Sequence, residues 1–318
     1  MLLVIVGMVI GFVLLYKGGD FLVTGAAGIA RKKNIPAFIV GITLVAFGTS
    51  APELFFNLIS AMHGNAEFAL SNVSGSNLIN LCVGIGISAM ITALPIKREV
   101  FAKDLLFLFI GPLLILIFIA VSGRNALTLV HGLFLFVGFA GYLFWTNREM
   151  IRHNRKLPKS DQACMDASCK REWGIFFMGG VMLYAGGEII FRNALTIVER
   201  LQISESIVGL TVIAVGTSIP DCAASIIAVF KKQKDIAIGN ILGSNIFNIF
   251  LVLAATIVAF NEPIFFNQSN FFDYLSVFIL SFLFFIVVIT RQSYGPVMGF
   301  FTLAYYPVSL VVRVLYFG

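Results

Sequence analysis

The sequence predicts an all-α polytopic membrane protein with ten transmembrane helices, built as two inverted repeats of five helices. Three observations support this fold class. The 318 residues are 59% hydrophobic and 12% charged, with a mean hydropathy of +0.96, well above the range of soluble domains. Several apolar runs exceed the roughly 20 residues that a helix needs to cross a bilayer. One stretch of about 40 residues occurs twice, without gaps, at a displacement of 168 positions.

The apolar runs divide the chain into two sets of five spans. The only long hydrophilic connection, residues 152–173, lies between the sets, so we expect a first half at 1–151, a cytoplasmic linker at 152–173 and a second half at 174–318. The first run resembles a signal peptide but lacks a basic amino-terminal region and a cleavage site, so it is counted as a retained span. The expected spans are 2–30, 36–62, 67–93, 102–122, 126–150, 174–200, 205–230, 235–260, 271–290 and 295–316.

The repeat has its centre at residues 41–80 and 209–248. These segments read GITLVAFGTSAPELFFNLISAMHGNAEFALSNVSGSNLIN and GLTVIAVGTSIPDCAASIIAVFKKQKDIAIGNILGSNIFN. The similarity continues upstream at the same displacement, with Asp20 aligned with Glu188. Because five is an odd number of spans, the second half must cross the membrane upside down relative to the first. Secondary transporters with this inverted plan place their substrate site at the midplane between the halves.

The distribution of Lys and Arg gives the orientation. If the amino terminus lies outside, the loops on the cytoplasmic side hold seventeen Lys and Arg, and the opposite side holds three. This asymmetry follows the positive-inside rule and predicts a multi-pass protein of the cell (inner) membrane. The net charge of +6 is thereby explained by topology, which excludes a nucleic-acid partner.

Each central repeat places one carboxylate, Glu53 or Asp221, directly after a proline in the middle of a span. A charge at that depth is costly and marks an ion or substrate path. Pro52 has no N–H, so the carbonyl of Gly48 loses its helical partner and the turn is expected to open. An unpaired carbonyl inside a membrane is tolerated only where protein, water or an ion satisfies it. The candidate ligands near the first carboxylate are therefore the carbonyls of Ala46, Gly48 and Thr49, and the second copy repeats the pattern with Gly216, Thr217 and Pro220.

A second polar stripe follows in the next span of each copy. Gly75 and Gly243 beside the stripes would allow close helix approach. Asn57 and Ser225, one turn beyond the carboxylates, fit site lining and helix contact equally well. The stripes consist of Asn72, Ser76 and Asn80 in the first half and Asn240, Ser244 and Asn248 in the second.

The candidate ligands are all oxygen atoms, and neither His nor Cys occupies matching positions in the two copies. Hard cations such as Ca²⁺ and Na⁺ suit this set, whereas Zn²⁺ and Cu⁺ do not. Without a nucleophile–base pair or a phosphate loop, an enzyme is not expected, and no cofactor or obligate protein partner is indicated. Cys164 and Cys169 in the linker are interpreted as reduced thiols. Asp20 and Glu188 are expected to form internal ion pairs near Lys17 and Arg192.

The two central segments resemble the alpha repeats of the cation/calcium exchanger superfamily, in its prokaryotic-type sodium/calcium exchanger branch. The resemblance rests on GTSAPE with SNVSGSNLIN and on GTSIPD with GNILGSNIFN, and it covers essentially the whole chain. The G-N-x-x-E core of the proton-coupled branch is missing. Asp221 stands where many prokaryotic exchangers have Glu. Asn248 stands where the potassium-dependent branch has Asp, which makes potassium co-transport less expected.

The resemblance implies electrogenic exchange of Na⁺ for Ca²⁺ by alternating access, with the first and sixth spans sliding across a fixed core. The alternatives are Ca²⁺/H⁺ exchange, potassium-dependent exchange and, less expected, a cation channel. By position, Ca²⁺ would be bound by Glu53, Asp221 and the carbonyls of Thr49 and Thr217. Sodium would share both carboxylates and add Ser50, Ser76, Ser218, Ser244 and the carbonyls of Ala46 and Ala214, with Asn80 and Asn248 flanking the centre.

Overall fold

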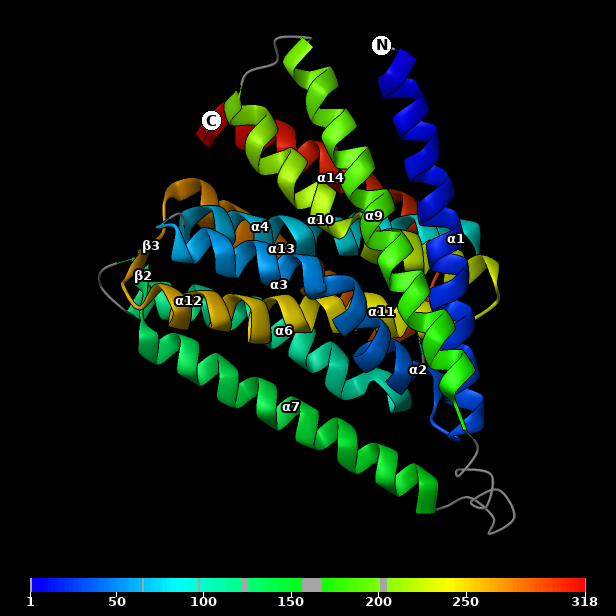
Figure 1. The fold of residues 1–318 in the computed structure, drawn as a ribbon. Coiled ribbons are helices and arrows are strands. Elements are labelled where there is room, and N and C mark those ends of the chain that lie inside the picture. Colours follow the sequence, from blue (N-terminus) through cyan, green and yellow to red (C-terminus); the bar gives the residue numbers. More distant parts are fainter. Residues whose placement is uncertain are drawn as a thin grey trace.

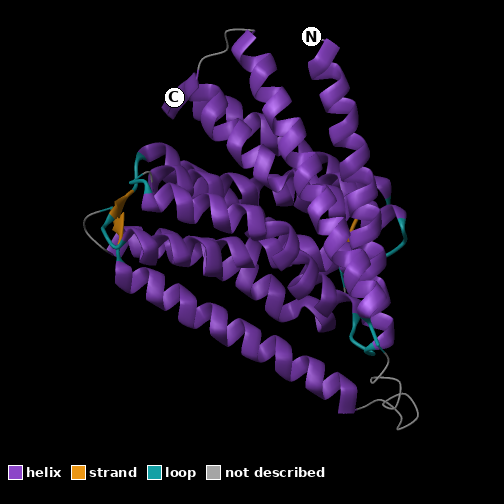
Figure 2. Cartoon of the chain, viewed as in Figure 1, coloured by secondary structure: helices purple, strands orange, loops and turns teal. Residues whose placement is uncertain are grey.

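The computed structural model describes residues 2–64, 66–96, 98–121, 125–155, 168–200 and 205–317, and these residues are almost entirely helical (Figure 2). Three of the spans contain a π-helical segment, labelled η. The first half consists of α1 (Leu2–Lys32), α2 (Ala37–Val40), η1 (Gly41–Val45), α3 (Ala46–Met62), α4 (Ala66–Ile79), η2 (Asn80–Ile85), α5 (Gly86–Ile91), α6 (Arg98–Val121) and α7 (Leu129–Arg155). The second half consists of α9 (Lys170–Arg200), α10 (Glu205–Phe230), α11 (Lys234–Phe247), η4 (Asn248–Leu253), α12 (Ala254–Phe260), α13 (Gln268–Arg291) and α14 (Pro296–Phe317).

The helices follow the ten expected spans, five in each half. Within the described part of the chain, eight helices are long and apolar enough to cross a bilayer, and Val215–Phe230 forms a shorter apolar helix. The tenth span, α14, has 22 residues. The prediction of an all-α polytopic membrane protein is confirmed.

The helices α1 and α9 lie side by side, steeply inclined to α3, α4, α11 and α12 (Figure 1). Glycines allow this contact, because a Cβ at Gly18 would lie 2.6 Å from the backbone N of Leu183 and one at Gly179 would lie 2.3 Å from the backbone N of Leu22. Gly18 and Gly186 are related by the repeat displacement, so each half contributes glycine at the same place. The first and sixth spans therefore form one closely packed pair.

The interior of the protein is formed where α11 crosses the start of the second span. A Cβ on Gly239 would lie 2.6 Å from the carbonyl oxygen of Phe38, and one on Gly243 would lie 2.5 Å from that of Ile42. Every residue from Ile236 to Phe247 is buried. Small residues thus bring the backbones of the two halves into direct contact at the centre of the bundle.

Two short strand pairs repeat the internal symmetry. The strand β1 (Leu94–Pro95) pairs with β4 (Ser293–Tyr294), and β2 (Ala126–Leu127) pairs with β3 (Ile264–Phe265). Each pair joins the loop after the third span of one half to the loop before the fifth span of the other. The inverted plan therefore extends to the loops at opposite ends of the helices.

The proline turns differ from expectation. The helices α3 and α10 continue through Pro52 and Pro220, so the missing N–H does not interrupt either helix. The irregular backbone lies elsewhere, in η1, η2 and η4, and two of these π-helical segments begin at Asn80 and Asn248. π-helical turns inside α-helices are frequent at functional sites.

The cytoplasmic side of the expected topology differs from the structure at Lys103 and lies partly outside the described residues. Lys103, one of the seventeen Lys and Arg counted on the cytoplasmic side and the second residue of the expected span 102–122, is buried in α6, where it pairs with Glu149 of α7. Residues 156–167 of the linker, including Cys164, lie outside the described residues. Cys169 is buried.

Candidate functional site

Glu53 on α3 and Asp221 on α10 both lie fully buried in the centre of the helix bundle. They are close enough for their negative charges to repel each other directly. No Lys or Arg forms an ion pair with either carboxylate in the part of the chain that the structure describes. Two buried acids without a basic partner are unstable unless another cation or a proton neutralises them.

Asp221 is surrounded by hydrogen-bond donors from three helices. Asn80 Nδ2 donates to Oδ2 at 2.8 Å, and Ser244 Oγ donates to Oδ1 at 2.9 Å. Ser50 Oγ of α3 lies 3.4 Å from Oδ2. Two of these donors, Ser50 and Asn80, belong to the opposite repeat, so the first half supplies much of the surroundings of the carboxylate of the second.

Glu53 lacks the corresponding contacts. Ser218 and Thr217 of α10 lie beside its carboxylate, but neither of its oxygens forms a hydrogen bond within the described residues. Ser218 Oγ and Asn248 Oδ1, both fully buried, also lack partners there. Burying unpaired polar oxygens is unfavourable, and a cation would satisfy several of them together.

The hydroxyl and amide groups around the carboxylates form two matching chains of hydrogen bonds. In one, Thr49 Oγ1 donates to Asn240 Oδ1 at 3.1 Å, and Asn240 Nδ2 donates to Ser225 Oγ at 2.8 Å. In the other, Thr217 Oγ1 donates to Asn72 Oδ1 at 3.1 Å, and Asn72 Nδ2 donates to Asn57 Oδ1 at 3.4 Å. All three pairs of corresponding residues differ by 168 positions, and in each chain the threonine of one half bonds to the asparagine of the other half's polar stripe. Asn57 and Ser225, for which the sequence did not distinguish site lining from helix contact, belong to these chains of hydrogen bonds.

Asn80 is the first residue of η2 and Asn248 is the first residue of η4, and their side chains have different hydrogen-bond partners. Asn80 donates to Asp221, whereas Asn248 Nδ2 donates to Asn77 Oδ1 at 3.0 Å. Asn77 Nδ2 in turn lies 3.3 Å from the carbonyl oxygen of Asn245. Sequence reasoning missed Asn77 and Asn245, although both occur at the same place in the two copies. Ser76 Oγ lies 3.3 Å from Thr217 Oγ1, and Thr217 lies beside Glu53.

The predicted backbone ligands lie on the same helices. Ala46 is fully buried, and its carbonyl oxygen lies 3.3 Å from Thr49 Oγ1. Because Pro52 and Pro220 have no N–H, the carbonyls of Gly48 and Gly216 have no helical donor four residues later. Ala214 lies in the first part of α10, where the side chains are outside the described residues.

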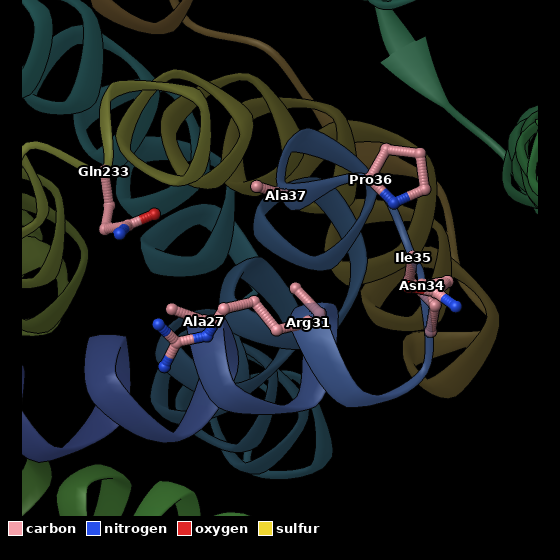
Figure 3. A pocket seen from close by; sticks show the side chains of 8 residues that line it. Ala27, Arg31, Asn34, Ile35, Pro36, Ala37 and Gln233 are labelled. Carbon is pink, nitrogen blue, oxygen red and sulfur yellow. The ribbon is translucent and has the colours of Figure 1, made fainter. Parts of the chain in front are cut away.

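A cavity of ≈ 850 Å³ lies between α3, α9 and α10 and reaches the residues beside the carboxylates. Its lining includes Gly48, Pro52, Gly216 and Pro220. Most of the other lining residues are apolar or aromatic, and Glu188 is the charged residue among them. It therefore provides space from the edge of the bundle to the freed carbonyls. A smaller cavity of ≈ 330 Å³ at the end of α1 is unsuited to cations, because its lining contains Arg31 and no carboxylate (Figure 3).

The acidic residues predicted to form ion pairs behave differently from each other. Glu188 pairs with Arg192 one turn away, at 2.6 Å, as expected. Asp20 does not pair with Lys17 but with Lys231 at the end of α10, at 2.5 Å. The expectation for Lys17 was wrong because spacing along one helix cannot show that another helix supplies a cation.

The donor set as a whole is one of oxygen atoms. Among the described residues no group of three His, Cys, Asp or Glu side chains gathers, so metal binding would use two carboxylates together with hydroxyl, amide and carbonyl oxygens. Ca²⁺ takes about six to eight oxygens, and Na⁺ also prefers hard oxygen ligands. The arrangement can hold hard cations and has no soft ligands at its centre.

Comparisons with known proteins agree with two repeats around an oxygen-lined centre. The family model described as sodium/calcium exchanger protein matches residues 3–147 and again residues 171–315, so the two matches differ by the repeat displacement. The putative antiporter CaxA of Alkalimonas amylolytica is 33% identical over 268 residues, covering 81% of this chain and 82% of that protein. The sodium/calcium exchanger MaX1 of Methanosarcina acetivorans is 25% identical over 280 residues, covering 77% of this chain and 80% of that protein.

A solved structure shares the fold over nearly the full length. The sodium-calcium exchanger NCX_Mj, soaked with 2.5 mM Na⁺ and 0.1 mM Sr²⁺, superimposes with a TM-score of 0.81 and 27% identity. The similarity covers 97% of this chain and 99% of that one.

Proposed function

Because the chain belongs to the sodium/calcium exchanger family, we propose that it exchanges Na⁺ for Ca²⁺ across the cell membrane by alternating access. The observation that carries the proposal is the position of Glu53 and Asp221. Both are fully buried, one comes from each inverted repeat, and no basic partner neutralises either within the described residues. Such a pair requires a cation or a proton, and its repeat-related origin matches a cation site between two moving halves.

The ligand assignment follows the two repeats. Ca²⁺ is bound by both carboxylates and by the carbonyls of Thr49 and Thr217. Sodium shares the carboxylates and uses neutral oxygens around them. These neutral ligands are Ser50, Ser76, Ser218, Ser244 and the carbonyls of Ala46 and Ala214, with Asn80 and Asn248 at the flanks.

Exchange follows from competition for the same oxygens. Two ionised carboxylates are neutralised by one Ca²⁺ or by two Na⁺. A third Na⁺, as the family resemblance implies, gives the sodium-loaded site one positive charge, so the cycle moves net charge. One charge crossing the membrane is worth about 2.3 kcal/mol per 100 mV, so a negative interior favours Na⁺ entry and Ca²⁺ export.

The orientation is part of the proposal. The amino terminus lies outside, and the linker at 152–173 lies in the cytoplasm between the halves 1–151 and 174–318. The distribution of Lys and Arg supports this arrangement.

The test is Ca²⁺ uptake by proteoliposomes under separate gradients. An outward Na⁺ gradient should drive Ca²⁺ uptake, and a K⁺ diffusion potential should change its rate. A proton gradient without Na⁺ should have no effect. Uptake driven by protons alone would instead identify a Ca²⁺/H⁺ antiporter, and Ca²⁺ flux without any counter-ion would identify a channel.

A further inference from the structure

The two repeats are not in equivalent conformations. In the second half, the end of α10 packs tightly against α1: Ile227 is only 7% exposed, and a Cβ at Gly19 would lie 2.3 Å from its Cδ1. We refer to this packing of Gly19 and Ile227 as the α1–α10 contact. It closes the space between the first span and the core on the side of the membrane where α10 ends.

The counterpart of this contact is open. The residues equivalent to Gly19 and Ile227 are Gly187 and Ile59, each displaced by 168 positions. Ile59 is 56% exposed, and the atoms nearest to a Cβ at Gly187 belong to Pro220, at 3.6 Å. Both residues instead line the ≈ 850 Å³ cavity that reaches the freed carbonyls. The α3–α9 contact, defined by Gly187 and Ile59, is therefore not formed on the side where α3 ends.

The charged residues beside the two contacts show the same asymmetry. Lys231, one residue beyond the end of α10, lies 2.5 Å from Asp20 Oδ1 and donates to Thr24 Oγ1 at 2.8 Å. The counterparts of Lys231 and Asp20 are His63 and Glu188. His63 is exposed and its Nδ1 lies 2.8 Å from the carbonyl oxygen of Ile59, whereas the Glu188 carboxylate pairs with Arg192.

We propose that these four residues control which side of the membrane has access to the site: Asp20 and Lys231 hold the α1–α10 contact closed in this state, and Glu188 and His63 hold the α3–α9 contact closed in the opposite state. The inference rests on the proposed function, because it requires alternating access. In an inverted repeat, the opposite-facing state is obtained when the two halves exchange conformations. Exchanging them closes Ile59 on Gly187, brings His63 to Glu188 and separates Lys231 from Asp20.

The packed unit of α1 and α9 explains why the two contacts alternate. Because Gly18 and Gly179 lock these helices backbone to backbone, α1 and α9 move together relative to the core. Movement that separates Gly19 from Ile227 then carries Gly187 toward Ile59. Residues that stabilise one contact therefore oppose the other, and removing one ion pair shifts the population of states.

The test measures access from each side with a membrane-impermeant thiol reagent. Ile59→Cys and Ile227→Cys are introduced separately into a protein in which Cys164 and Cys169 are replaced by Ser, and the parent protein gives the background. Intact cells expose one side and inside-out vesicles the other. Asp20→Asn or Lys231→Gln should lower labelling of the cysteine at 59 and raise labelling of the cysteine at 227, each about two- to fivefold, as expected for a partly exposed ion pair. Glu188→Gln or His63→Ala should produce the reverse.

The controls separate control of access from general damage. Lys32 and Glu172 form an ion pair of 2.9 Å within the unit of α1 and α9, so Glu172→Gln removes a comparable pair without favouring either state. Lys231→Arg keeps the charge and should restore the labelling of the parent. The proposal is overturned if all four substitutions leave labelling unchanged, or if both cysteines change in the same direction. Labelling does not depend on which ion is carried. If labelling at 59 and 227 changes in opposite directions but the protein shows no Na⁺-driven Ca²⁺ uptake, the proposal on the two contacts stands and the proposed ions are wrong.

Discussion

Asn80 of the first repeat donates a 2.8 Å hydrogen bond to the Asp221 carboxylate of the second repeat. The equivalent amide, that of Asn248, donates to Asn77 instead, and neither oxygen of Glu53 forms a hydrogen bond within the described residues. One carboxylate is thus held by hydrogen bonds from neutral donors, while the other lies beside the hydroxyls of Ser218 and Thr217. The proposed ion site combines both halves and is asymmetric between them.

Removing either carboxylate should abolish exchange. Glu53→Gln or Asp221→Asn leaves one negative charge at a buried site, so Na⁺-driven Ca²⁺ uptake should fall more than about tenfold, since charge interactions are strong at low dielectric. Uptake by proteoliposomes measures the exchange rate, and elution of the purified variant as a single species shows that it still assembles. Glu262→Gln, the same change at an exposed loop residue, is the matched control. Normal uptake by both site variants would remove these residues from the mechanism.

Asn248→Asp should make exchange sensitive to potassium. Asn248 is fully buried with its Oδ1 unpartnered in the described part of the chain, so Asp at this position adds a third negative charge beside the pair. An additional monovalent cation can then be bound with Ca²⁺. Added K⁺ should stimulate Ca²⁺ flux in the variant and have no effect on the unmodified protein. Equal insensitivity of the variant and of the Asn261→Asp control, in an exposed loop, would count against this role.

Gly179→Ala should loosen the pair formed by α1 and α9. The added Cβ would lie 2.3 Å from the backbone N of Leu22, and such overpacking costs about 1–3 kcal/mol. The melting temperature in detergent should decrease, and uptake should decrease with it. Gly141→Ala is the control, because no atom lies within 4 Å of that Cβ, and it should keep or raise the melting temperature. A melting temperature that is equally unaffected in both variants would show that α1 and α9 are not packed backbone to backbone.

Tyr142→Phe should reduce stability without changing ion selectivity. The Tyr142 hydroxyl on α7 donates to the buried Asp104 carboxylate on α6 at 3.0 Å, and neither residue is among the proposed ion ligands. Losing a donor to a buried acid costs about 1–3 kcal/mol. The variant should melt at a lower temperature and keep its dependence on Na⁺ and Ca²⁺. Tyr16→Phe, at an exposed position, controls for the loss of a hydroxyl. A changed Na⁺ dependence would place Asp104 in the transport cycle.

Much of the architecture could be predicted because hydrophobicity and duplication are visible in sequence. Apolar runs gave the ten spans, and the displacement of 168 positions paired Thr49 with Thr217 and Asn72 with Asn240. These pairs form matching hydrogen-bond chains because each repeat folds in the same way.

Other features depend on contacts that no local pattern records. Spacing along α1 suggested Lys17 as the partner of Asp20, but Lys231 of another helix takes that place. No local pattern marks the π-helical turns that begin at Asn80 and Asn248, whereas Pro52, which looked like a break, is accommodated within its helix. The unequal surroundings of Glu53 and Asp221 belong to one conformational state. Two repeats with similar sequences do not show which repeat takes which conformation in that state.

Calcium binding to the purified protein at increasing Na⁺ concentrations tests the central claim most directly. If Glu53 and Asp221 share their oxygens between the two ions, calorimetric titration should give one Ca²⁺ per chain. The apparent Kd should rise with Na⁺ more steeply than in direct proportion, because several Na⁺ replace one Ca²⁺. A Kd independent of Na⁺, or two Ca²⁺ bound independently at the two carboxylates, would contradict the account.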